Sequence, residues 1–157
     1  MTRLLFFDDK AYEAGTSWSD YARYWRDNRD ALNDVLLRLN GGMLPIDILD
    51  DVPDPIVLHD SRVQTFDATR STITMSLHGD NKGALREIHL RYTGVTEYDH
   101  PSKQLFADQP ESDLLIHETT ANADGLFKHT MRFANDELIA ITFTKIEVKT
   151  VDHPLPA

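Results

Sequence analysis

The sequence contains no cysteine, and its 157 residues include fewer bases than acids, 16 Lys and Arg against 26 Asp and Glu. The missing thiols exclude thiol nucleophiles, thiolate metal sites and iron–sulfur clusters. The net charge of −10 argues against nucleic acids and anionic membranes, which are bound largely through Lys and Arg. The charge permits a basic protein as partner, because opposite charges steer molecules into encounter, and it is equally explained by solubility alone.

Long apolar runs are also missing. The N-terminus has only residues 4–7 in an apolar row before two acids, much less than a signal peptide or a membrane span requires. We therefore expect a cytoplasmic protein that does not bind membranes. With 41% hydrophobic residues, the chain is long enough to form a single domain, residues 1–157, whose core needs neither metal nor disulfide.

Residues 17–40 show the clearest helical pattern. Ser17, three residues before Asp20, resembles a capping box, and Gly41 and Gly42 provide a stop. Between these ends, apolar residues recur at intervals of three and four, which predicts one long amphipathic helix in an N-terminal segment of residues 1–40. Its apolar stripe comprises Trp18, Tyr21, Trp25, Leu32, Val35 and Leu39.

Residues 41–61 form a predicted connector that is rich in proline and aspartate. Pro45, Pro53 and Pro55 interrupt any helix there. The connector also carries five acids without a compensating base, and their spacing does not match a calcium-binding EF-hand loop. These acids are Asp47, Asp50, Asp51, Asp54 and Asp60.

From residue 62 onward the apolar period changes to two, which predicts β-structure over residues 62–149 and a tail over residues 150–157. The strands are expected at residues 63–67, 72–77, 87–92, 114–119, 127–133 and 137–149, with a five-residue hairpin loop at 79–83. The predicted fold is therefore α+β, with the long helix packed on an antiparallel sheet of about six strands.

Two parts of the β-region are similar at an offset of 51 residues. The pattern Ile88-x-Leu90-x-Tyr92-x-x-Val95 returns at residues 139–146, and residues 60–63 align with residues 111–114. A duplicated three-strand unit explains both matches, and so does the common alternation of strands; both explanations stay open. The change of period predicts a β-bulge at Gly94 and another at Lys145.

His59 and Asp60 are the first candidates for chemistry, because a His–Asp pair is a ligand pair in helical HD phosphohydrolases. Here the pair precedes a strand, where Asp60 and Ser61 favour a turn instead. His117 and Glu118 do not complete a His-Glu-x-x-His zinc motif, because position 121 is Ala. No Gly-x-Ser-x-Gly elbow and no phosphate-binding loop is present, so no catalytic, cofactor or metal residue is predicted.

Four histidines belong to the predicted strands and could converge on one face of the sheet: His78, His89, His117 and His129. His129 is in phase with Phe127 and Met131, which predicts a neutral, hydrogen-bonded imidazole in the core.

Two segments, Leu58-His59-Asp60-Ser61-Arg62-Val63 and residues 132–148, resemble small uncharacterised bacterial α+β proteins. Some of these resemble immunity proteins of contact-dependent or polymorphic toxin systems. The resemblance covers roughly the last 95 residues. It implies a cytoplasmic, non-enzymatic protein that neutralises a toxin.

The sequence therefore favours a non-catalytic, immunity-like module that binds a basic partner protein through Asp47, Asp50, Asp51, Asp54, His59 and Asp60. The alternative is a metal-assisted hydrolase or small-ligand-binding protein that uses His59 and Asp60. A structural subunit of a larger assembly is a third possibility.

Overall fold

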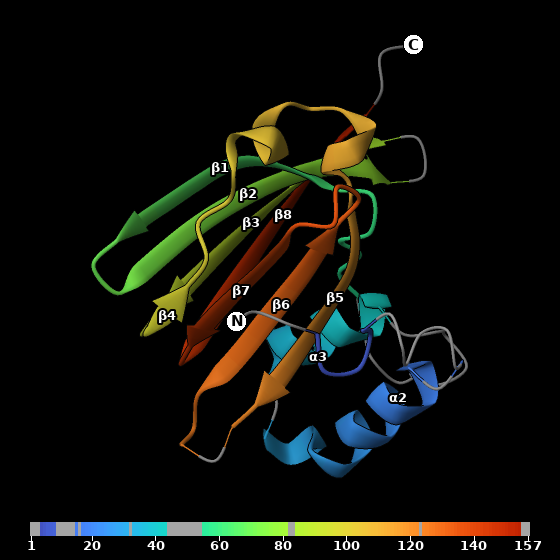
Figure 1. Ribbon diagram of the computed structural model, residues 1–157, viewed down its shortest axis with the longest axis vertical. Helices are drawn as coiled ribbons and strands as arrows, with labels where there is room; N and C mark the ends of the chain where they lie inside the picture. The colour runs from blue at the N-terminus through green and yellow to red at the C-terminus, as the bar shows by residue number, and fades with distance from the viewer. Residues whose placement is uncertain are drawn as a thin grey trace.

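The computed structural model describes residues 4–8, 15, 17–31, 33–43, 55–81, 84–122 and 124–154. The fold is α+β, as predicted: helices near the N-terminus accompany two antiparallel sheets of four strands each (Figure 1). None of the helices in these segments has the length and apolar character that a membrane crossing requires.

The predicted single helix over residues 17–40 is wrong. Helix α2 covers Ser17–Asp27, a 3-10 turn η1 covers Arg29–Ala31, and helix α3 covers Asp34–Met43. Two asparagines account for the break: Asn28 Nδ2 donates to the Tyr24 carbonyl at 2.8 Å, and Asn33 Oδ1 accepts from Leu36 N at 3.0 Å. Asn33 thus caps a new helix, a position that asparagine favours. Of the predicted apolar stripe, Tyr21, Trp25 and Leu39 are fully buried, and Trp18 and Val35 are partly buried against the core. Leu32 lies outside the described residues.

The single sheet of about six strands is also wrong. One sheet has the order β1-β2-β3-β8, formed by β1 (Arg62–Thr69), β2 (Thr72–Asn81), β3 (Ala84–Thr93) and β8 (Lys145–Pro154). The other has the order β4-β7-β6-β5, formed by β4 (Glu97–Tyr98), β7 (Leu138–Phe143), β6 (Phe127–Phe133) and β5 (Leu114–Ala121).

The strand boundaries differ from the prediction for local reasons. The expected strand at 137–149 divides at Thr144 into β7 and β8, and β8 continues to Pro154 through most of the predicted tail. The β2–β3 ladder continues to the pair Asn81 and Ala84, so the hairpin loop is shorter than predicted. The polar segment after β4 contains two 3-10 turns, η2 (Lys103–Phe106) and η3 (Pro110–Ser112).

The predicted bulges at Gly94 and Lys145 are absent. The period breaks there because the chain leaves one sheet for the other: β3 is followed across Gly94 by β4, and β7 is followed across Thr144 by β8. The chain therefore forms two three-strand meanders, β1–β2–β3 and β5–β6–β7. The strand that follows each meander, β4 or β8, joins the opposite sheet. The register shifts in fact lie between Val63 and Thr65 in β1 and between Leu114 and Ile116 in β5.

The crossing point is tightly packed. Thr144 N donates to the Thr93 carbonyl at 3.0 Å, and Thr144 Oγ1 donates to the same oxygen at 3.1 Å. Gly94 has φ +66°, and a Cβ at this position would lie 2.0 Å from Thr144 Oγ1. Glycine is therefore required here both for its backbone conformation and for space.

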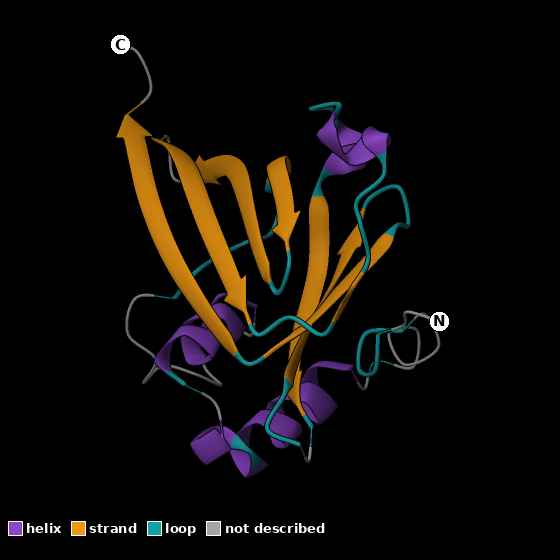
Figure 2. Ribbon diagram, turned by 90° about the vertical axis from the view of Figure 1, so that its left-hand side faces the viewer, coloured by secondary structure: helices purple, strands orange, loops and turns teal. Residues whose placement is uncertain are grey.

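The core lies between the two sheets and extends to the helices. Figure 2 shows helices α2 and α3 at one end of the sheets and the 3-10 turns η2 and η3 at the other. Helix α3 contacts β5 in one sheet and β8 in the other, so it packs across the end of both. The inward side chains include Met75, Leu90, Tyr92, Met131, Ile141 and Phe143.

Candidate functional site

His59 and Asp60 form a turn immediately before β1. Asp60 adopts the left-handed conformation with φ 64°, which Asp tolerates better than most residues. Asp60 N donates to the Leu114 carbonyl and Leu114 N donates to the Ser61 carbonyl, both at 2.8 Å. These bonds join the chain before β1 to the start of β5, so the turn predicted before the strand is confirmed and is fixed to the opposite sheet.

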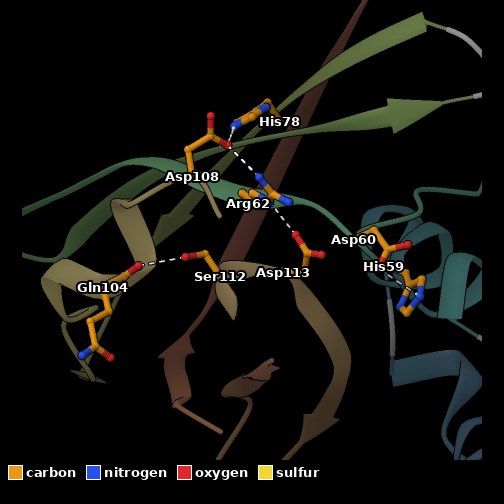
Figure 3. Close-up of polar contacts among 8 residues, drawn as sticks. All are labelled: His59, Asp60, Arg62, His78, Gln104, Asp108, Ser112 and Asp113. Carbon is orange, nitrogen blue, oxygen red and sulfur yellow. Dashed lines mark hydrogen bonds and ion pairs between the residues drawn. The ribbon is translucent and has the colours of Figure 1, made fainter. Parts of the chain in front are cut away.

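A network of charged side chains lies beside this turn (Figure 3). Arg62 Nε donates to Asp113 Oδ1 at 2.5 Å, and Arg62 Nη1 donates to Asp108 Oδ1 at 3.2 Å. The hydrogen bond that Arg62 donates to Asp113 raises the pKa of Arg62 above its ordinary value. His78 Nε2 lies 3.2 Å from the same Asp108 oxygen. The network therefore joins β1, β2 and the segment that precedes β5.

Exposed apolar side chains flank the turn. Val57 is 44% exposed and Leu115 is 37% exposed. His59 connects their segments, since its Nδ1 lies 2.9 Å from the Leu115 carbonyl oxygen. We call this region the β1/β5 surface and define it by Val57, His59, Asp60, Asp108, Glu111, Asp113 and Leu115.

The four connector acids predicted as partner-binding residues, Asp47, Asp50, Asp51 and Asp54, lie outside the described residues. In the sequence, Asp54 directly precedes Pro55, where the described segment that carries Val57 and His59 begins.

Each nitrogen of the His59 ring lies close to an oxygen atom. Its Nδ1 faces the Leu115 carbonyl, and its Nε2 lies 3.3 Å from Asp60 Oδ1. Metal sites in proteins require several converging ligands. In the segments that the structure describes, no three His, Asp or Glu side chains gather so that they could hold a metal ion. His59 and Asp60 are adjacent, but these segments supply no third ligand for the metal-assisted alternative.

Two of the predicted histidines do converge, in the core. Tyr92 Oη lies 2.7 Å from His129 Nδ1, and His129 Nε2 lies 3.0 Å from His117 Nδ1. Burial lowers the pKa of His117 to about 4 and that of His129 well below its ordinary value. The hydrogen-bonded core position predicted for His129 is confirmed, and the lowered pKa favours its neutral form. His78 and His89 lie elsewhere, beside Asp108 and Glu87.

Sequence reasoning did not identify Arg62, His78, Asp108 and Asp113 as a network. One signal was present: the 51-residue offset aligns Arg62 with Asp113, and these residues are in contact. Thr93 and Thr144 are separated by the same number of residues and also touch. Both contacts join positions that the hypothesis of a duplicated unit makes equivalent.

Comparison with known proteins identifies no relative. The sequence matches no protein-family model, and it shows no significant similarity to a curated protein or to a solved structure.

Proposed function

We propose that this chain is a non-catalytic protein-binding module that binds a basic partner, as an immunity protein would bind a toxin, through the β1/β5 surface and the connector that precedes it. The observation that carries the proposal is the charge of this surface. Asp60, Asp108, Glu111 and Asp113 supply four carboxylates against the single guanidinium of Arg62.

The composition of the surface also supports binding to a protein. Interfaces commonly have an apolar centre and a polar rim. Val57 and Leu115 provide exposed apolar area, and Asp60 and Asp108, each with a side chain that is 65% exposed, provide charge beside it. A basic partner would contact carboxylates first and then bury the two apolar side chains.

The backbone around this surface is well fixed, which favours binding without large rearrangement. The bonds between residues 60–61 and Leu114 hold the turn against β5, and Arg62 holds Asp108 and Asp113 on the same side. A surface ordered before binding loses little conformational entropy when the partner arrives.

The test begins with capture of partners from lysate at low and high salt, followed by binding kinetics with the purified partner. One variant combines Asp60→Asn with Glu111→Gln, and a second replaces Asp47, Asp50, Asp51 and Asp54 by Asn. Both are expected to lower the association rate about tenfold and to flatten its dependence on salt.

A matched control combines Asp124→Asn with Glu147→Gln, which removes two exposed acids from other parts of the molecule. It should change the association rate much less. Equal effects of control and test variants would indicate general charge attraction rather than this surface, and unchanged rates in both test variants would contradict the proposal.

A further inference from the structure

The outer face of the β4-β7-β6-β5 sheet carries a groove that the proposed function does not use. Two hollows of about 480 and 450 Å³ share Thr96, Glu97, Lys128 and Thr142 in their linings and therefore adjoin each other. Each volume is in the range of sites for small organic molecules.

A row of polar side chains forms the floor of the groove. Glu97 pairs with Thr142, Thr142 pairs with Lys128, and Lys128 pairs with Thr120 across three neighbouring strand ladders. Side chains directly opposite each other on paired strands lie on the same face. Glu97 and Lys128 are thus two strand spacings apart, roughly 10 Å between their backbones, with Thr142 between them.

Both charges of this row are available to a ligand. In the segments that the structure describes, no carboxylate lies within ion-pair distance of Lys128, and no base lies within that distance of Glu97. The nearby Asp99 is engaged, because its Oδ2 accepts Ala140 N at 3.0 Å. An ion pair formed directly between Lys128 and Glu97 at such an open site would contribute little free energy. A ligand that replaced this ion pair would therefore lose little binding energy.

The wall of the groove is apolar and ordered. It is formed by Leu5, Phe6 and Tyr24, and Leu5 is 55% exposed. The Tyr24 hydroxyl accepts Ala121 N at 2.8 Å, and the Tyr24 ring lies 5.2 Å from the Phe6 ring between centroids. The backbone N–H groups of Leu5 and Phe6 donate to the buried carboxylate of Glu118, which holds residues 4–8 beside the sheet.

We propose that this groove binds a free α-amino acid with an apolar side chain. The ligand carboxylate would bind the Lys128 ammonium, the ligand ammonium would bind Glu97 across Thr142, and the apolar side chain would pack on Leu5, Phe6 and Tyr24. The hydroxyls of Thr120 and Thr142 flank Lys128 and can donate to the same carboxylate.

The charge of the chain selects a zwitterion over simpler ligands. A pure anion would be repelled by a chain with net charge −10, and a pure cation would leave the Lys128 ammonium without a counter-charge. A zwitterion adds no net charge and satisfies both groups. The apolar wall then distinguishes side chains such as those of leucine and phenylalanine from glycine.

The experiment is an NMR titration of the isotope-labelled full chain with L-leucine and L-phenylalanine up to about 20 mM. Three analogues each lack one feature: L-leucinamide has no carboxylate, 4-methylpentanoate has no ammonium, and glycine has no apolar side chain. We expect saturable amide shifts at residues 96–97, 120, 128 and 142 with the two amino acids, and binding at least about tenfold weaker for each analogue.

Protein variants test the same contacts from the other side. Lys128→Met and Glu97→Gln should each weaken leucine binding about tenfold or more, whereas Lys145→Met, at an exposed lysine on β8, should leave it unchanged. Absence of saturable shifts, equal binding of leucine and its analogues, or shifts unaffected by Lys128→Met would each overturn the proposal. The analogue series is measured on the unaltered protein, so it decides the question even if a variant fails to fold.

Discussion

At the scale of single residues, the hydrogen-bonded chain from Tyr92 through His129 to His117 determines how the core responds to acid. Two neutral imidazoles satisfy this chain when the Tyr92 hydroxyl donates to His129 and His129 Nε2 donates to His117. His117 Nε2 is buried without a hydrogen-bond partner among the described residues. A proton added to either ring would place a charge in the core next to a second imidazole.

This arrangement predicts that acid destabilises the protein through His117. Burial lowers the pKa of His117 from 6.5, its value in the unfolded chain, to about 4 in the folded protein. The unfolded state therefore takes up the proton first, so the free energy of unfolding is highest above pH 6.5 and falls as the pH is lowered toward 4. Between pH 7 and pH 5 the loss is about 2 kcal/mol for one such histidine. Urea unfolding of the wild type and His117→Phe at both pH values should show a correspondingly smaller pH effect in the variant.

His153→Phe is the matched control, because its side chain is 51% exposed. Comparing variants rather than absolute stabilities removes the effect of net charge, which also changes over this pH range. If His117→Phe and His153→Phe had the same pH dependence, the buried pair would not be the cause.

At the scale of elements, the crossing of Gly94 and Thr144 determines where the strands end. Gly94→Ala should destabilise the fold by roughly 2–4 kcal/mol, because it combines a positive φ with a clash against Thr144. Gly125→Ala is the control: it has φ +77° but no atom within 4 Å of the added Cβ, so only the backbone cost of about 1 kcal/mol is expected. The free energies come from urea unfolding, and equal costs at both sites would contradict the role given to the crossing.

The elements also show what the sequence could and could not predict. The alternation in residues 72–77 and 127–133 identified strands because their inner faces are buried against the opposite sheet. The division of the helical region depends on Asn28 and Asn33, whose side chains can cap a helix or face solvent within one. The apolar stripe is the same in both cases, so periodicity alone did not distinguish one helix from two.

The candidate site was predictable only in part. A turn at Asp60 follows from local chemistry, but the partners of Arg62 come from a segment 46 to 51 residues away. Two sheets rather than one could not be inferred from alternation, because a strand has the same pattern in either arrangement. The period breaks near residues 94 and 145 marked the right places, and their cause was a change of sheet rather than a bulge.

At the scale of the whole molecule, the net charge of −10 opposes the compact state through self-repulsion. Added salt screens this repulsion, and the exposed ion pairs that salt also weakens, such as Lys145 with Glu147, contribute little. Raising NaCl from about 0.02 to about 0.5 M should therefore increase the free energy of unfolding in urea, on the order of 1 kcal/mol. A decrease with salt would show that the ion pairs outweigh the repulsion.

Because β4 and β8 each lie in the sheet of the other meander, the two halves of the chain should stay together after the backbone between them is cut. The segment between the two meanders contains η2 and η3, and several of its residues are exposed. One proteolytic cut there would leave two fragments, each with a strand inserted in the sheet of the other, β4 beside β7 and β8 beside β3. The cleaved protein should elute as a single species in gel filtration and separate only in denaturant, because the two halves complement each other like the fragments of a split protein.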